Sequence, residues 1–380
     1  MTGLRLRAVA GVMLLLVVSA ALVGLSVVDR SRDCAVERIN PVRTFDDLPN
    51  VDLAVTGLGA VWAVTSDLPD TFSPGDARAS LIRVDPASGR TEHVLTDLTA
   101  PPAPLVLAGR VWVGLDDRVI ALDADGEQVD SFGWDRRGTV FAGPEHLWLT
   151  DFEGGAVVVV DPSTAEVVRT IATGAFPVAP IVAFGRAWVP SAIEGTVTVI
   201  DTDMTSGATS VTLELTDRPL TDVVAVPNGS RGAEVWAIDL DGVIFAIDAT
   251  ATSNDDIRRV EVDRAINQVV PSGDRAVLLP TWGRSVLIVD VASAGVLAEL
   301  DIGSIPVRAI AAGGRVWVTT DGAAETLSLI DPMRLEVLDQ RSIGVNSSNT
   351  TGPTQPVATD DEVWVPNRGD DTLYAIPMCG

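Results

Sequence analysis

The stretch GRVWVTTDGAAETLSLIDP, residues 314–332, contains both motifs that decide the fold. A glycine turn leads into β-branched residues around Trp317, and after a second turn the chain runs through apolar residues to Asp331 and Pro332. Val, Ile and Trp favour strands, whereas Gly and Asp favour turns, because Gly permits positive φ and Asp accepts hydrogen bonds from nearby backbone N–H groups. The stretch therefore predicts two consecutive strands joined by a loop.

Both motifs recur along the chain. The Trp motif occurs as GAVWAV (59–64), GRVWVG (109–114), EHLWLT (145–150), GRAWVP (185–190), AEVWAI (233–238), GRVWVT (314–319), DEVWVP (361–366) and, without Trp, DRAVLLP (274–280). The second motif follows each copy as LIRVDP (81–86), VIALDA (119–124), VVVVDP (157–162), VTVIDT (197–202), IFAIDA (244–249), VLIVDV (286–291), LSLIDP (327–332) and TLYAIP (372–377). The period of about 40 residues is that of a four-stranded propeller blade. Eight copies predict an all-β, eight-bladed propeller over residues 34–380.

The eighth repeat ends after its third strand, so its blade lacks an outer strand. A spare β-rich segment, around residues 35–39 to 44–45, precedes the first repeat. We predict that this N-terminal segment supplies the missing strand in the last blade and closes the propeller. Cys379 then ends the last strand where Cys34 begins the spare one, and the ends of antiparallel neighbours meet. These two cysteines are predicted to form a disulfide, which a location outside the cytoplasm permits.

Residues 1–33 are predicted to be a separate targeting region. Residues 8–28 form an uncharged apolar run that is long enough to cross a bilayer as a helix. Arg5 and Arg7 precede it, which favours a cytoplasmic N-terminus and a single-pass anchor with the propeller on the extracytoplasmic side. The alternative is a signal peptide cut near Ser19 and Ala21, which would leave a secreted protein.

The composition excludes several classes of protein. The sequence has 52 acidic and 27 basic residues, for a formal charge of −25, which argues against a nucleic-acid partner and against an anionic lipid surface. Apolar residues make up 47%, which excludes a disordered chain. With two His and two Cys, zinc fingers and His-rich metal centres are excluded.

The repeated VWV…IDP…G pattern resembles the bacterial YVTN/YncE-type and PQQ-like propeller repeats over about residues 36–377. The resemblance implies the fold and carries little information on function, because the shared motifs are structural. Quinone-binding relatives carry a docking Trp after the turn, and none follows residues 85–89 here, so no quinone site is predicted. Lyase-type relatives depend on a catalytic His, and the two here, His93 and His146, both lie in strand-like runs.

The tryptophans divide into two groups. Seven lie in the second strand of a repeat, and this constant phase favours packing between blades over a ligand platform. Trp134 and Trp282 lie outside that phase, in loop-like segments close to Arg136 and Arg284. Aromatic residues beside Arg in loops are typical of recognition surfaces, although such a Trp can also simply cover a blade edge.

Acidic residues follow the second strands, on loops that converge at one end of a propeller. They are candidate ligands for Ca²⁺, although no stretch matches a twelve-residue calcium loop, and the alternative interpretation is that they stabilise solvated turns. Two long insertions, residues 66–79 and 344–354, lengthen the connections further. The candidate ligand-binding residues are therefore Asp151, Asp239, Trp282, Arg284, Asp321, Asn367, Arg368, Trp134 and Arg136.

Three functions remain open at this point. The first is a non-catalytic binding scaffold whose acidic face recognises a protein, a peptide or a small cationic ligand. The second is an extracytoplasmic enzyme of the lyase, lactonase or quinoprotein type that uses channel carboxylates with or without a divalent metal. The third is a structural protein of the cell envelope. No residue set in the sequence identifies a nucleophile, so no catalytic residue is predicted.

Overall fold

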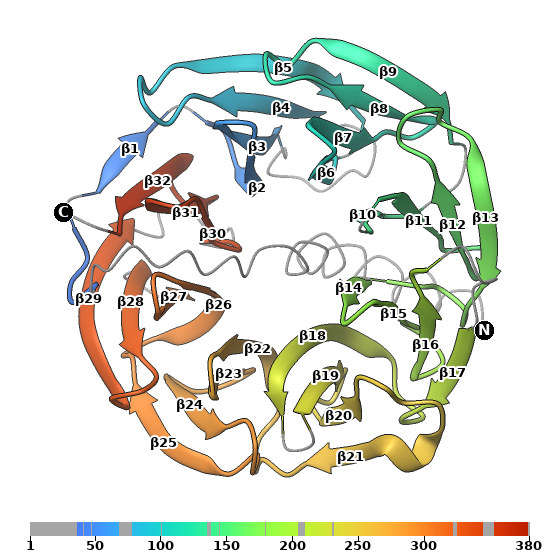
Figure 1. Ribbon diagram of the computed structural model, residues 1–380. Helices are drawn as coiled ribbons and strands as arrows, with labels where there is room; N and C mark the ends of the chain where they lie inside the picture. Colours follow the sequence, from blue (N-terminus) through green and yellow to red (C-terminus); the bar gives the residue numbers. More distant parts are fainter. Residues whose placement is uncertain are drawn as a thin grey trace, which may run out of the picture. The chain divides into compact units, whose positions relative to one another are not determined.

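The computed structural model describes residues 36–378, except residues 41, 47, 68–77, 100, 135–137, 144, 179, 204–209, 230–231, 322–324 and 345–352. The described chain consists of β-strands and one short 3-10 helix, Asn254–Asp256. The strands form eight antiparallel sheets of four strands each. In Figure 1 the four strands of each sheet lie side by side as one blade. The predicted topology of an all-β, eight-bladed propeller is confirmed.

The chain forms two compact units. The first unit covers residues 136–225 and 233–260 and contains blades 3, 4 and 5, apart from residues 226–232 of blade 5, which belong to the second unit. Blade 3 comprises β10 (Val140–Ala142), β11 (Leu147–Asp151), β12 (Ala156–Val160) and β13 (Val167–Ala172). Blade 4 comprises β14 (Ile181–Ala183), β15 (Arg186–Pro190), β16 (Thr196–Asp201) and β17 (Ser210–Glu214). Blade 5 comprises β18 (Leu220–Gly229), β19 (Gly232–Asp239), β20 (Ile244–Asp248) and β21 (Ile257–Val260).

The second unit contains the other five blades. Blade 1 comprises β2 (Val51–Gly57), β3 (Ala60–Asp67), β4 (Arg78–Val84) and β5 (Thr91–Leu98). Blade 2 comprises β6 (Pro104–Leu107), β7 (Arg110–Gly114), β8 (Arg118–Leu122) and β9 (Gln128–Gly133). Blade 6 comprises β22 (Ile266–Ser272), β23 (Arg275–Pro280), β24 (Ser285–Asp290) and β25 (Val296–Asp301). Blade 7 comprises β26 (Ile305–Ala312), β27 (Arg315–Asp321), β28 (Glu325–Asp331) and β29 (Glu336–Gly344). Blade 8 comprises β30 (Val357–Ala358), β31 (Glu362–Asn367), β32 (Thr372–Pro377) and β1 (Arg43–Phe45).

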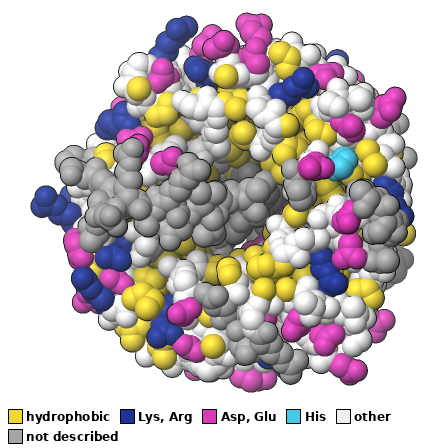
Figure 2. Space-filling model, in the orientation of Figure 1, with side chains coloured by type: hydrophobic (Ala, Val, Ile, Leu, Met, Phe, Trp, Pro, Cys, Tyr) yellow, Lys and Arg dark blue, Asp and Glu magenta, His cyan; other side chains and the backbone are white. Residues whose placement is uncertain are grey.

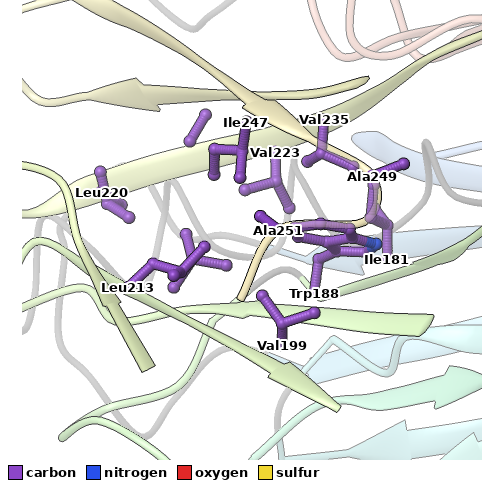
Figure 3. Packing of buried hydrophobic residues seen from close by; sticks show 12 residues of the cluster. Ile181, Trp188, Val199, Leu213, Leu220, Val223, Val235, Ile247, Ala249 and Ala251 are labelled. Carbon is purple, nitrogen blue, oxygen red and sulfur yellow. The ribbon is translucent and has the colours of Figure 1, made fainter. Parts of the chain in front are cut away.

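Within each unit, repeated tryptophans pack between successive blades, as predicted: Trp148 and Trp188 in the first unit, and Trp317 and Trp364 in the second. All seven repeated tryptophans are at most 1% exposed. In the first unit, Trp188 of blade 4 packs with Val235 and Ile247 of blade 5. Figure 3 shows its indole among labelled side chains from both blades. Burying an aromatic side chain of this size contributes several kcal/mol of stability. The Trp side chain is therefore a main contributor to the contact between these neighbouring blades.

The N-terminal segment completes blade 8, as predicted. Strand β1 pairs antiparallel with β32, with Thr44 opposite Tyr374. The ordered ladder is shorter than expected, because only Arg43–Phe45 form the strand. Residues 36–40 contact both blade 7 and blade 8, because Val36 and Ile39 are buried in an apolar cluster that the two blades form together. Burial of these apolar side chains stabilises the segment where it is not part of the ladder.

Three predictions fall outside the described residues. Cys34 and Cys379 are both outside, so their disulfide stays a prediction, as does the division of the chain at residues 33 and 34. The apolar run 8–28 is also outside. Within the described residues, no helix has the length and apolar character needed to span a bilayer.

Candidate functional site

The predicted ligand-binding residues lie at one end of their blades. In an antiparallel four-stranded blade, the loop between the second and third strands lies at the same end as the connection to the next blade. Asp151 and Asp239 occupy this position in the first unit, and Trp282, Asp321 and Asn367 occupy it in the second. The two units are therefore considered separately below.

Asp151 and Asp239, in the first unit, stabilise tight turns. The Asp151 carboxylate accepts a hydrogen bond from the backbone N–H of Gly154 at 2.8 Å. The Asp239 carboxylate accepts one from the N–H of Val243 at 2.9 Å. Both side chains are buried against their own hairpins. This geometry favours the turn-capping interpretation of these two acids, since a carboxylate that accepts nearby backbone N–H groups fixes its loop.

Trp282 and Arg284, in the second unit, lie on the loop between β23 and β24. Trp282 is 77% exposed, in contrast to the buried repeat tryptophans. Arg284 is exposed as well, and its backbone carbonyl accepts the N–H of Ile302 at 2.8 Å. Ile305, at the start of β26, adds a further exposed apolar side chain three residues beyond that contact. The loop presents a large aromatic surface to solvent from a backbone that is fixed at Arg284.

The remaining loop candidates are less exposed. Trp134 is partly buried, and its backbone N–H donates to the carbonyl of Asp117 at 2.9 Å. Asp321 ends β27 and is partly buried. Arg136 lies outside the described residues.

On the face that Figure 2 shows, acidic side chains are spread among arginines and neutral residues. Exposed ion pairs such as Arg264 with Glu299, at 2.9 Å, each contribute about 0–1 kcal/mol.

Asn367 connects blade 8 to blade 7. Its side-chain amide donates to Glu325 Oε2 at 2.6 Å and to the carbonyl of Ile343 at 3.2 Å, and its Oδ1 accepts the N–H of Gly369 at 2.7 Å. Asn367 and Glu325 are both fully buried. Burial raises the pKa of the Glu325 carboxyl. The hydrogen bond from Asn367 lowers this pKa by a smaller amount, and the negative charge of Asp370 raises it further.

Asp370 and Tyr374 lie beside this pair. The Tyr374 hydroxyl donates to Asp370 Oδ2. Burial raises the pKa of the Asp370 carboxyl, although the hydrogen bond from Tyr374 opposes the shift. The pKa of Tyr374 is raised in turn, first by burial and then by Asp370. Two carboxyl groups, from blades 7 and 8, therefore share a buried environment that disfavours charge on both.

Arg368 connects blade 8 to blade 1. Its Nε donates to Asp52 Oδ1, and the Ser66 hydroxyl donates to Asp52 Oδ2 at 2.8 Å. Burial raises the pKa of the Asp52 carboxyl, and this effect exceeds the opposing influence of Arg368 and Ser66. The two adjacent residues Asn367 and Arg368 thus reach in opposite directions, to blade 7 and to blade 1.

The structure therefore places two of the predicted residues, Asn367 and Arg368, in two adjoining polar groups at the blade junctions, which we together call the junction cluster. Its other members, which the sequence analysis did not select, are Asp52, Ser66, Glu325, Asp370 and Tyr374. The signal that could have identified Asp52 and Glu325 is an acid at or inside an apolar strand run. Tyr374, the single tyrosine of the chain, lies within the eighth copy of the second motif.

The enzyme hypothesis required acids from at least three blades to converge within metal-ligand distance. Within the residues that the structure describes, no three His, Cys, Asp or Glu side chains form such a group. His93 is an exposed residue of β5, and His146 is a partly buried turn residue before β11. The predicted three-blade carboxylate site is not present among these residues.

Comparisons with known proteins show the fold. No protein-family model matches the chain, and no curated protein sequence matches it. Solved structures match over most of its length. BamB from Moraxella catarrhalis has a TM-score of 0.61 and 13% identity over 89% of this chain and 99% of its own. A virginiamycin B lyase from Staphylococcus aureus has a TM-score of 0.52 and 13% identity over 72% and 93%. A chain of the Mitotic Checkpoint Complex has a TM-score of 0.53 and 11% identity over 94% and 99%.

These likenesses show that the chain has a β-propeller fold. At identities of 11–13% they carry no information on ligand or activity. The more specific YVTN/YncE assignment stays a prediction.

Proposed function

We propose that this chain is a non-catalytic recognition module, anchored by residues 8–28 with its propeller on the extracytoplasmic side. It binds a protein or peptide through the loops at the end of blades 6–8 where Trp282 lies. One of the structurally similar chains was solved within a protein complex, the Mitotic Checkpoint Complex, which is consistent with a propeller in this role.

The exposure of Trp282 is the observation that carries the proposal. A Trp that leaves 77% of its surface in water gives up most of the stabilisation that its burial would provide. Trp and Arg are the residues most enriched among those that dominate binding energy at protein interfaces. Trp282 and Arg284 sit two residues apart on one loop, whose backbone accepts a hydrogen bond at Arg284 from the N–H of Ile302, so both side chains are available to the same partner.

The charge of the chain indicates the chemistry of the partner. With a formal charge of −25, the protein attracts a positively charged protein or peptide, and complementary charge raises the rate of encounter. In this arrangement Trp282 supplies the apolar anchor, and the net negative charge of the chain supplies long-range attraction. The recognised segment is therefore expected to combine basic residues with an apolar residue that packs on the indole.

Trp282→Ala tests this function. We expect partner affinity to fall about thirtyfold, because removing an interface anchor costs about 2 kcal/mol or more. The stability of the protein should change by less than about 0.5 kcal/mol, since the side chain is exposed. Partners are first identified by in-cell crosslinking of the tagged wild-type protein, and their affinities are then measured with purified components.

Met333→Ala is the matched control. Met333 is 60% exposed on the turn between β28 and β29, at the opposite end of blade 7 from the Trp282 loop. It should bind the same partners as the wild type. If Trp282→Ala and Met333→Ala retain every partner with equal affinity, Trp282 is not a binding residue and the proposal is wrong.

A further inference from the structure

Two acids of the junction cluster each leave one buried oxygen without a partner. Glu325 is fully buried, and its Oε1 has no hydrogen-bond partner among the residues that the structure describes. Oδ1 of Asp370 is likewise buried and unpartnered. The second oxygen of each group is engaged, with Asn367 and with Tyr374. A buried carboxylate without a compensating partner is costly, so each oxygen has the character of an unfilled ligand position.

The charged groups that act on Glu325 are all negative. Asp370 approaches from the loop after β31, and Asp321 from the end of β27. The neighbouring arginine of this loop, Arg368, is directed to Asp52 on blade 1. Among the described residues, no ion pair links Glu325 to an arginine, although buried carboxylates usually have such a partner.

Glycines border the same space. A Cβ at Gly344 would lie 2.7 Å from Asp370 Oδ2 and 2.8 Å from Glu325 Oε2. A Cβ at Gly369 would lie 2.7 Å from Glu325 Oε1. At Gly344 the two acids approach the backbone with the oxygens that Asn367 and Tyr374 engage, and Glu325 Oε1 lies against Gly369. A side chain at either glycine would collide with these oxygens.

We propose that Glu325 and Asp370 form a binding site for a hard divalent cation of the Ca²⁺ type. Such cations take oxygen ligands from carboxylates, backbone carbonyls and water, and they are held by flexible arrangements of this kind. Glu325 Oε1 and Asp370 Oδ1 supply the charged ligands. Asn367 is a positioning residue, because its amide fixes Glu325 Oε2 and its Oδ1 fixes the loop that carries Asp370.

The site joins two blades of the second unit. Glu325 begins β28 of blade 7, and Asp370 lies between β31 and β32 of blade 8. A bound cation would bridge the last two repeats of the chain. With only two charged ligands we expect a weak site, with a Kd of about 10⁻⁴–10⁻³ M, the range of extracellular calcium modules. The inference does not depend on the proposed recognition function.

The test is calcium titration of the full-length protein in mild detergent at pH 7 and constant ionic strength. Calorimetry of the wild type should show one site. Because a ligand that binds the folded state stabilises it, 10 mM CaCl₂ should raise Tm above the value in EDTA by about 2 °C or more. Glu325→Gln and Asp370→Asn should each lose the binding heat and the Tm shift. Glu127→Gln, at an exposed position, is the matched control and should keep both.

Two results would overturn the proposal. One is a wild type that shows neither binding heat nor a Tm shift with calcium. The other is an equal calcium response in the wild type and in Glu325→Gln, which would place the binding elsewhere.

Discussion

The indole N–H of the repeated tryptophans shows how a single residue links two strands of one blade. In four blades it donates to the carbonyl five residues earlier, near the end of the inner strand, at 3.1–3.3 Å: Trp62 to Gly57, Trp112 to Leu107, Trp188 to Ala183 and Trp317 to Ala312. In blade 3 the corresponding residue is Gly143, and the indole nitrogen of Trp148 packs directly against it: a Cβ at Gly143 would lie 2.2 Å from Trp148 Nε1. No hydrogen-bond partner of this nitrogen is found among the described residues. In those four blades the polar atom of the buried ring is thus satisfied within its own blade.

At the same scale, the buried acids predict an unusual pH dependence. The pKa of Glu325 in the folded protein lies above its ordinary value of 4.5, so the folded state binds its proton more readily than the unfolded state. The free energy of unfolding should therefore decrease as pH rises through the folded pKa. Acids with lowered pKa values, such as Asp290, act in the opposite direction at lower pH. The difference between variants isolates the contribution of Glu325.

We expect Glu325→Gln to lose less stability than the wild type between pH 4.5 and pH 7 in EDTA. Asp370 interacts with Glu325, so the measured profile belongs to the pair. Urea unfolding at a series of pH values measures the effect, and Glu127→Gln should follow the wild type. Parallel profiles for Glu325→Gln and the wild type would show that Glu325 does not titrate differently on folding.

At the scale of elements, the N-terminal segment contacts three blades of the second unit. Before β1, the N–H of Ile39 donates to Asp339 of blade 7 at 2.8 Å. Arg43 of β1 donates to the carbonyl of Pro86 in blade 1 at 2.7 Å. Phe45 is buried with its ring centroid 5.2 Å from that of Trp364 in blade 8. A three-residue strand is a weak edge by itself, so these contacts give β1 most of its stability.

Phe45→Ala should therefore destabilise the second unit by about 3 kcal/mol, because it leaves a cavity beside Trp364. Amides of β32 should exchange with solvent faster, since β32 would lose its outer neighbour. Urea unfolding and hydrogen exchange measure the two effects. Phe184→Ala, at a residue that is 39% exposed, is the control and should cost less than about 0.5 kcal/mol. Equal costs for the two variants would mean that Phe45 does not hold β1 in place.

At the scale of the whole molecule, the predicted disulfide would join the two ends of the repeated region. Val36 and Met378, close to Cys34 and Cys379 in sequence, both contact Gly313, each with an atom 3.2 Å from its ideal Cβ position. Peptide mapping without reduction should recover one peptide pair that contains both cysteines. Reduction should lower the free energy of unfolding by up to about 5 kcal/mol in the chain-entropy model. Free thiols at both positions in the protein isolated from its native compartment would contradict the pairing.

The sequence by itself determined the repeat, the number of blades, the buried role of the seven tryptophans and the pairing of the N-terminal segment with β32. These follow from local patterns, because strand and turn preferences act over a few residues and the copies repeat them. It also identified Asn367 and Arg368 as residues of interest. Only the tertiary structure decided that Asp151 and Asp239 cap turns and that Asp52, Glu325 and Asp370 lie in the junction cluster. The turn caps join residues three or four positions apart, and the structure decided only which of the two interpretations of these acids holds. The contacts of Glu325 with Asn367 and of Asp52 with Arg368 join residues 42 and 316 positions apart, and only the stacking of blades brings such residues together.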